Sequence, residues 1–169
     1  QDPMQVVSGR LDKHIVHYQA PPSNIVKKEM DRFVNWYNTT HFQKDTSTLT
    51  KAGITHLYFL AIHPFEDGNG RIARALSEKS ISIDLGRPAL LSLSQTINKH
   101  KKDYYSALEK HNRTLDITQW LVYFGESILE SQQNTIKIIE FLIKKAKFFD
   151  VHSHQINDRQ LKVIQRIFK

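Results

Sequence analysis

The segment "HPFEDGNGRIAR", residues 63–74, brings together residue types that suit phosphate chemistry. Its single histidine has an ordinary pKa near 6.5, so it can take a proton from a hydroxyl group near neutral pH. Gly68 and Gly70 allow the backbone to turn successive N–H groups toward one point, and free amides at the start of a helix bind anions. Arg71 and Arg74 lie three residues apart on the helix that follows, so both can hold further phosphate oxygens.

Asp67 is the exception in this segment, because a carboxylate repels a phosphate. The repulsion becomes attraction if Mg²⁺ bridges the two groups, since Mg²⁺ uses one or two protein carboxylates together with phosphate oxygens. The chain holds no Walker loop, and Arg71 stands where an EF-hand loop needs an oxygen ligand. A lone histidine or a lone D-G-N-G turn is most often structural. Their combination favours a nucleotide-phosphate site with its own general base, His63.

Two helices are expected to position this segment. The apolar run at residues 49–62 predicts a central helix, and Pro64 cannot continue it. His63 then lies at the mouth of a loop, in which we expect Phe65 to turn inward as an anchor. A second helix is predicted at residues 69–84, where "LGRP" supplies a helix-ending glycine and a proline.

The remaining elements predict a mainly α fold. Residues 5–18 resemble a small β-hairpin, because two β-prone pairs flank "SGRLDK". Ser23 or Asn24 can cap a helix that ends near residue 38, and further helices are predicted at residues 95–111 and 118–147. The last of these has an inward stripe made of Trp120, Leu121, Phe124, Ile128, Ile136, Ile139 and Ile143. The scattered histidines are interpreted as structural: His41, His56, His100 and His111.

The sequence changes character after residue 150. His152 and His154 belong to a segment that we interpret as a solvated linker, and Asn157 with Gln160 predicts a capping box. One helix cannot bury its own apolar face. We therefore expect one domain at residues 1–150, and a linker with the first helix of a truncated second domain at residues 151–169.

Composition narrows the function classes. The chain of 169 residues has no cysteine, which excludes disulfides and Cys-ligated metals and fits a cytoplasmic protein. No apolar run approaches the ~18 residues of a membrane span, so we expect no membrane partner. The net charge of +7 favours anionic partners such as nucleotides or nucleic acid, although solvated lysine-rich helix faces explain it equally well.

Residues 63–74 match H-x-F-x-[DE]-G-N-G-R-x-x-R at every defined position and so resemble the signature of the Fic (Fic/DOC) family. The resemblance covers about residues 5–145. "VSGR…VHYQAPP" is similar to the family's flap hairpin, and "DYYSALEKHN" and "LDITQWLVYF" are similar to its later helices. It implies a Fic-type helical bundle with a β-hairpin flap. The tail "INDRQLKVIQRIFK" resembles the start of a winged-helix module, through which nucleic acid could bind.

The resemblance also implies an activity, the transfer of AMP from Mg-ATP to a Ser, Thr or Tyr hydroxyl of a target protein. By that likeness His63 is the general base and Asp67 the Mg²⁺ ligand. The phosphates are then held by Gly68, Asn69 and Gly70 as an anion hole, by Arg71 at the β-phosphate and by Arg74 at the γ-phosphate. Tyr104 and Asn112 match positions near the adenine or ribose, with helix packing as an equal alternative. The flap residues His14, Ile15, Val16 and His17 would pin the target by main-chain pairing.

Other functions stay open. Kinase-type relatives depart from the G-N-G core, which is intact here, so transfer of another nucleotide or of phosphate is less favoured. Removal of AMP uses an inhibitory glutamate in the pattern [ST]-x-x-x-E-[GN], which this sequence lacks. A non-enzymatic regulatory or DNA-binding module would be favoured by loss of His63 or Asp67, and both are present. The target, its modified residue, self-modification, a homodimer and regulation by an inhibitory helix or antitoxin-like partner are left open.

Overall fold

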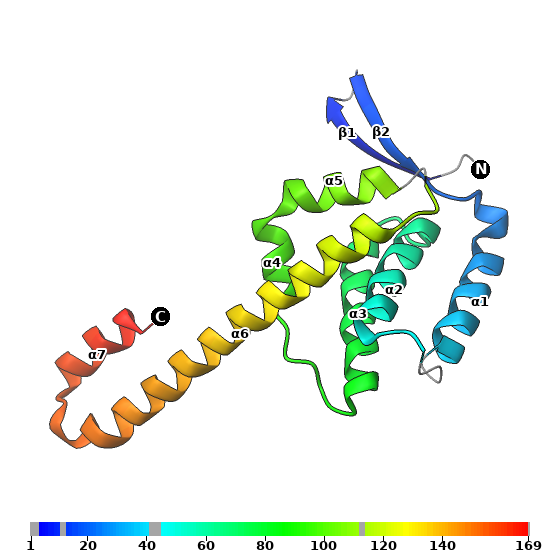
Figure 1. The fold of residues 1–169 in the computed structure, drawn as a ribbon. Helices are drawn as coiled ribbons and strands as arrows, with labels where there is room; N and C mark the ends of the chain where they lie inside the picture. Colours follow the sequence, from blue (N-terminus) through cyan, green and yellow to red (C-terminus); the bar gives the residue numbers. More distant parts are fainter. Residues whose placement is uncertain (1–3, 11–12, 41–44, 112–113, 169) are drawn as a thin grey trace.

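The computed structural model describes residues 4–10, 13–40, 45–111 and 114–168, which form a helical bundle with one β-hairpin (Figure 1). The elements follow the order β1 (Gln5–Arg10), β2 (Lys13–Gln19), α1 (Ser23–Thr40), α2 (Thr48–Ile62), α3 (Asn69–Leu85), α4 (Leu93–Lys99), α5 (Lys101–His111), α6 (Thr118–His152), a 3₁₀ turn (Ser153–Gln155) and α7 (Asp158–Ile167). The two strands are antiparallel, with Val7 opposite Val16. The expected mainly α fold with an N-terminal hairpin is confirmed.

The single helix predicted at residues 95–111 is two helices. The chain breaks at His100, where φ is −109° and ψ is 37°, and α4 and α5 run in different directions (Figure 1). Glu130 of α6 accepts hydrogen bonds from Lys99 Nζ at 2.8 Å and from His100 Nε2 at 3.2 Å. Because these partners lie far away in sequence, the apolar periodicity of the segment could not reveal the break.

Helix α2 contributes residues to two buried clusters. One consists of Phe33, Tyr37, Phe59, Ile62 and Ala73. The other consists of Ala52, Ile81, Leu93, Ile97, Tyr104, Trp120, Phe124 and Ile128. Gly53 of α2 allows a close approach of α6, since a Cβ atom there would lie 2.8 Å from Leu121 Cδ2. Trp120 Nε1 donates a hydrogen bond to the Gly53 carbonyl at 2.8 Å, so the first half of α6 is fixed directly on the backbone of α2.

A buried ion pair joins the far ends of α2 and α3. Lys51 Nζ lies 3.2 Å from Asp84 Oδ2, and the Thr48 hydroxyl donates to the same oxygen at 2.9 Å. A buried charge is tolerated when it is paired and hydrogen-bonded, as both members are here. The two helices are therefore connected by this pair at one end and by residues 63–68 at the other.

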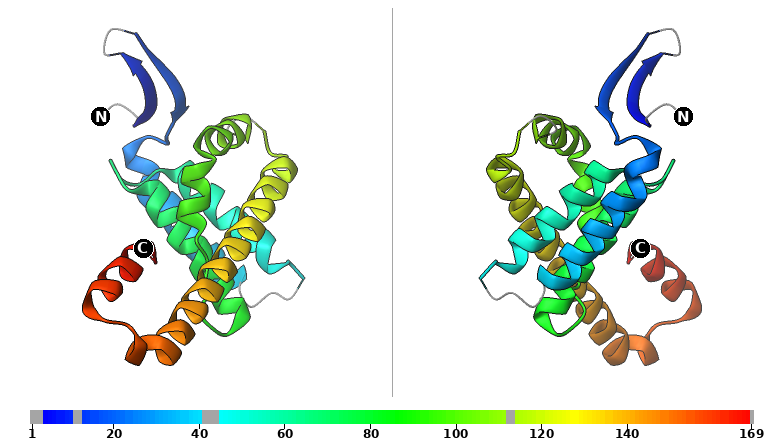
Figure 2. Two further views of the ribbon diagram at one scale, coloured as in Figure 1. Left: turned by 90° about the vertical axis from the view of Figure 1, so that its left-hand side faces the viewer. Right: turned by 90° about the vertical axis from the view of Figure 1, so that its right-hand side faces the viewer.

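The second half of α6 leaves the bundle. Past Ser131 no described residue of this helix is buried, and α7 then folds back beside it (Figures 1 and 2). The predicted inward stripe is therefore wrong beyond Ile128, because Ile136, Ile139 and Ile143 are 55%, 38% and 49% exposed. Periodicity indicates that a helix has an apolar face, but not that another element covers it. We call residues 132–168 the arm.

Helix α7 begins as predicted, whereas the linker before it is partly helical. The capping box is present, with Asn157 Oδ1 accepting from Gln160 N–H and Gln160 Oε1 accepting from Asn157 N–H, both at 3.0 Å. Helix α6 continues through His152 and is followed by the 3₁₀ turn. The division into two domains near residue 150 stays a prediction. No helix among the described residues has both the length and the apolar character needed to cross a membrane.

Candidate active site

His63 marks the point where α2 ends and the loop begins. It caps the helix in the left-handed conformation, with φ 50° and ψ 56°, and its N–H donates to the Phe59 carbonyl at 3.2 Å. It is the one non-glycine residue with positive φ in the described part of the chain. Such a conformation costs about 1–3 kcal/mol and persists where the surroundings enforce it. Pro64 contributes, because the residue before a proline is disfavoured in helical geometry.

Asn69 closes the loop from the inside. This side chain is buried, accepts from the Phe65 N–H at 3.1 Å and donates to the Phe65 carbonyl at 2.5 Å. The Phe65 ring is 47% exposed and lies beside Phe59, with ring centroids 6.4 Å apart. The expectation that Phe65 anchors the loop by turning inward is therefore wrong. The Phe65 backbone is the anchored group, and the Asn69 side chain is the anchor.

The start of α3 places a carboxylate beside free helix amides. Gly68 is the N-cap residue with φ 90°, a conformation that favours glycine. Asp67 accepts from Gly68 N–H at 2.6 Å and from Arg71 Nη2 at 2.7 Å. The Asp67 and Arg71 side chains are 90% and 71% exposed, so this ion pair is weak and can exchange its partners for a ligand.

Arg74 reaches a cavity of about 960 Å³ that His63 and Gly70 also line. Its Nε donates to the Ser94 hydroxyl at 3.0 Å. A Cβ atom on Gly70 would lie 3.4 Å from Arg74 Nη1, so glycine leaves room for the guanidinium. The structure thus brings five predicted site residues into the lining of one cavity: His17, His63, Gly70, Arg74 and Tyr104. Asp67, in the exposed loop, and Arg71, in the first turn of α3, lie outside this lining.

The hairpin forms part of the same cavity through His17 and Tyr18. The Tyr18 hydroxyl donates to the Ala61 carbonyl of α2, and its ring lies 6.5 Å from the ring of His63. His17 Nδ1 lies 3.6 Å from Glu109 Oε1 of α5. The end of β2 is therefore fastened to both walls of the cavity, while the rest of the hairpin projects from the bundle (Figure 2).

The predicted flap residues lie along β2 before this attachment. His14 and Ile15 pair with Gly9 and Ser8 of β1, and Val16 is exposed. Tyr18 lies within the predicted hairpin, but it was not among the predicted flap residues, His14 to His17. Two signals could have pointed to it. Tyr18 follows Val16 in the two-residue period of a strand, and it is the last aromatic residue before "APP".

Burial lowers the pKa of His63 from 6.5, and a backbone hydrogen bond at Leu60 offsets part of this shift. Desolvation favours the neutral imidazole over the charged form. His63 is therefore uncharged at neutral pH, as a group that must accept a proton has to be.

Tyr104 lies in the core and only borders the cavity. The ring is buried beside Trp120, and the hydroxyl lies 2.8 Å from His56 Nε2. Burial raises its pKa, which keeps the hydroxyl protonated. These contacts favour the helix-packing alternative for Tyr104 over contact with the adenine. Asn112, the other residue proposed for the nucleoside, lies outside the described residues.

The residues at the loop fit a metal ion that is completed by a substrate. The described part of the chain contains no group of three His, Asp or Glu side chains that could hold a metal alone. Asp67 offers one exposed carboxylate next to the start of α3. A hard cation such as Mg²⁺ takes one or two carboxylates and fills its other positions with phosphate oxygens and water, so this donor set fits it.

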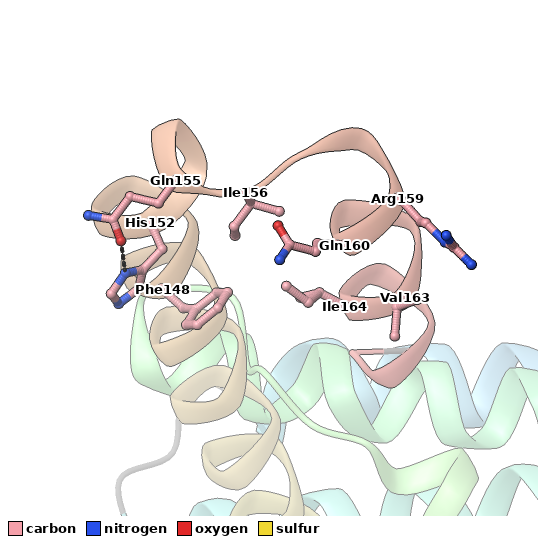
Figure 3. A pocket seen from close by; sticks show the side chains of 8 residues that line it. All are labelled: Phe148, His152, Gln155, Ile156, Arg159, Gln160, Val163 and Ile164. Carbon is pink, nitrogen blue, oxygen red and sulfur yellow. Dashed lines mark hydrogen bonds between the residues drawn. The ribbon is translucent and has the colours of Figure 1, made fainter.

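A second cavity, of about 520 Å³, lies in the arm between the end of α6 and α7. Figure 3 shows Phe148, Ile156 and Ile164 facing one another, while Arg159 points away. Of the residues predicted to form the site, none lines this cavity. It is an apolar gap between two helices rather than a candidate for phosphate chemistry.

Comparisons with known proteins relate this chain to one family. A model of the Fic/DOC family matches residues 4–80. A probable protein adenylyltransferase of Aquifex aeolicus is 31% identical over 93 residues, which cover 55% of this chain and 26% of that protein. A protein adenylyltransferase of Caenorhabditis elegans is 32% identical over 117 residues, which cover 66% of this chain and 21% of that protein. The chain thus spans about a quarter or less of these relatives.

A solved structure shows the same fold. The crystal structure of a Fic family protein from Desulfovibrio desulfuricans superposes with a TM-score of 0.61 over 85% of this chain and 38% of that chain, at 22% identity. The segment matched by the family model contains the hairpin, α1, α2, the loop from His63 and most of α3. Through residues 4–80, this chain is similar to the Fic/DOC family.

Proposed function

We propose that this chain transfers AMP from ATP to a Ser, Thr or Tyr hydroxyl of a target protein. One observation carries the proposal: His63, Gly70 and Arg74 line the same cavity, at the place where β2 is fastened to the bundle. A proton acceptor, a helix start and a cation therefore surround a space that an extended polypeptide can reach. The similarity to proteins named protein adenylyltransferase supports AMP as the transferred group.

In the proposed reaction, neutral His63 takes the proton from the target hydroxyl. The hydroxyl oxygen attacks the α-phosphorus, a new P–O bond forms, and the bond to the oxygen that bridges the α- and β-phosphates breaks. Pyrophosphate leaves with the electron pair of that bond. Such a step mainly requires that the reacting groups are positioned and that the phosphate charge is neutralised. The backbone amides and the arginines of this segment can supply both.

Each phosphate is assigned to a group of the loop. The backbone amides at Gly68, Asn69 and Gly70 take the α- and β-phosphates, and Arg71 exchanges its exposed contact with Asp67 for the β-phosphate. Arg74 holds the γ-phosphate from the cavity wall. Asp67 would hold Mg²⁺, which when bound supplies positive charge to the phosphate oxygens.

The hairpin is proposed to hold the target. In a sheet of two strands β2 is an edge strand, and an extended segment can pair with the side of β2 that faces away from β1. Tyr18 and His17 fix the end of β2 at the cavity, so a segment paired there is led toward His63. We place the reaction in the cytoplasm, which suits a chain without cysteine.

The test is incubation with Mg²⁺ and α-labelled ATP, alone and with added proteins, followed by autoradiography and intact mass. We expect a gain of one AMP that His63→Ala abolishes while ATP binding is kept. His152→Ala, a histidine of the arm, is the matched control and should transfer AMP like the unmodified chain. Label retained from γ-labelled ATP instead would indicate phosphate transfer. Failure of the unmodified chain to bind ATP would contradict the proposal.

A further inference from the structure

A row of buried polar side chains runs from the α2–α3 interface to the cavity that Arg74 lines. Ser77, His56 and Tyr104 are all buried. Ser77 Oγ lies 3.3 Å from His56 Nδ1, and His56 Nε2 lies 2.8 Å from the Tyr104 hydroxyl. Buried polar groups in such a row must be mutually satisfied, since no solvent can replace a missing partner.

The positions of the side-chain protons along the row follow from Ser77, whose hydroxyl lies beside two backbone carbonyls. Ser77 Oγ lies 2.8 Å from the Ala73 carbonyl and 3.2 Å from the Ala52 carbonyl. Carbonyl oxygens only accept, so the single Ser77 proton is directed to one of them, and Ser77 must accept from His56. The proton of neutral His56 therefore resides on Nδ1, and burial lowers the His56 pKa to about 3, which keeps the ring neutral.

The other end of the row, at Tyr104, borders the cavity that Arg74 lines. With Nδ1 protonated, His56 Nε2 accepts from Tyr104, so the phenol proton points into the core. The lone pairs of the Tyr104 oxygen are left for a donor, and Arg74 lines the same cavity as Tyr104. Burial raises the Tyr104 pKa, and the charge of Arg74 opposes this rise. Arg74 Nε donates to the Ser94 hydroxyl at 3.0 Å, which holds one edge of the guanidinium. Its remaining N–H groups are left for the cavity.

The charged and titratable groups around Arg74 fit this arrangement. Glu78 lies one turn further along α3 and is partly buried. Burial raises the Glu78 pKa, and the positive charge of Arg74 opposes this rise. Arg74 in turn contributes to the low pKa of His56. A charged His56 would repel Arg74, so the row is compatible with the guanidinium only while the imidazole is neutral.

We propose that His56 and Tyr104 are positioning residues, and that the row Ser77–His56–Tyr104 orients the Arg74 guanidinium so that the site prefers nucleotides with a terminal γ-phosphate. The inference rests on the proposed function for the meaning of the γ-phosphate, but the direction of the hydrogen bonds does not depend on it. Tyr104 then acts through Arg74 rather than by contact with the adenine.

The first experiment tests the direction of the row without any nucleotide. In a ¹⁵N-histidine-labelled protein, two-bond ¹H–¹⁵N correlations should show His56 as the neutral Nδ1–H tautomer. Tyr104→Phe should shift the His56 Nε2 resonance, because its donor is removed, and leave the tautomer unchanged. A His56 found as the Nε2–H tautomer in the unmodified protein would overturn the proposal.

The second experiment measures nucleotide binding by calorimetry. Tyr104→Phe should weaken ATP binding about tenfold, the loss expected for one hydrogen bond to a charged group, and leave AMP binding within about twofold. Tyr123→Phe, which removes a hydroxyl on α6 outside the cavity, is the matched control and should change neither affinity. His56→Gln, which keeps an acceptor for Tyr104, should bind ATP better than His56→Leu.

The outcomes separate the two proposals. Equal weakening of ATP and AMP by Tyr104→Phe, or no weakening of either, would overturn the positioning role. Absence of ATP binding in the unmodified chain would contradict the proposed function, whereas the tautomer measurement would still decide whether the row has the inferred direction. A thermal melt of Tyr104→Phe verifies that this variant folds. If Tyr104→Phe is unstable, the comparison of ATP binding by His56→Gln and His56→Leu takes its place.

Discussion

The bundle and the arm are built from the same kind of helix and differ in what covers it. In the bundle, α2 and α3 bury aromatic and aliphatic side chains together with paired polar groups such as Lys51 with Asp84. In the arm, α7 has a complete capping box but no buried residue. Periodicity and caps specify a helix locally, whereas burial requires another element opposite its apolar face.

Helix α6 shows this difference within one element. Trp120, Phe124 and Ile128 are buried against α2 and α4, whereas Ile136 and Ile143 continue the same period outside the bundle. The sequence pattern does not change between the two halves. What changes is the presence of Gly53 and its neighbours opposite the first half, which allow the helices to approach closely.

Removal of the central contact of α6 should have the largest effect. Trp120→Ala is expected to lower the free energy of unfolding by about 3–5 kcal/mol, because it leaves a cavity and an unpaired Gly53 carbonyl. Urea denaturation followed by circular dichroism measures the loss. A loss below about 1 kcal/mol would show that α6 does not form part of the cooperative core.

Acid should weaken the bundle through His56. In the unfolded chain the imidazole binds a proton below pH 6.5, whereas the folded chain binds it only near pH 3. Between these values the unfolded state holds more protons, so stability falls as the pH falls. We expect a loss of about 2 kcal/mol from pH 7 to pH 5 from this group. His56→Gln should flatten the pH dependence of the denaturation midpoint, and an unchanged dependence would contradict the buried neutral imidazole.

The two helix caps should have unequal effects. Ser47 accepts from Thr50 N–H at the start of α2, and Ser47→Ala is expected to lower the free energy of unfolding by about 1 kcal/mol. Asn157→Ala removes the cap of α7, which has no buried residue, so only this helix should open more often. Hydrogen exchange should be faster in α7 while the global denaturation midpoint stays the same. A lower midpoint for Asn157→Ala would place the arm within the cooperative unit.

The smallest effect is expected on the exposed stripe of α6. Ile136→Ala should change the free energy of unfolding by no more than about 0.5 kcal/mol, as for a surface position. Ile128→Ala, the same change two turns earlier at a buried position, is the matched control and should cost about 2–5 kcal/mol. If Ile136→Ala lowered the free energy of unfolding as much as Ile128→Ala does, at both low and high protein concentration, the prediction would be wrong. Another part of the same chain would then cover the exposed stripe.

The elements around the loop could be predicted because their signals lie within a few residues. Pro64 ends α2, the glycine at residue 68 begins α3, and the glycine in "LGRP" ends it, so the position of His63 followed from its neighbours. The hairpin and the capping box of α7 could also be predicted from neighbouring residues. Each depends on backbone preferences and on residues that lie close together in the sequence.

Other features depend on residues that meet only in the folded chain. The break at His100 is held by Glu130, and the row of buried polar side chains joins His56 to Tyr104 across 48 positions. Asn69 is a different case, because its partner Phe65 is near in sequence but its burial comes from the surrounding helices.

The sequence by itself determined most of the helices, the hairpin and the chemical groups of the loop, since local backbone energetics and residue type suffice for these. Only the tertiary structure decided which apolar faces are covered, that Tyr104 is directed to the core, and that Arg74 donates a hydrogen bond to Ser94. These depend on burial and on hydrogen bonds between distant helices, and such energies exist only once the helices have packed.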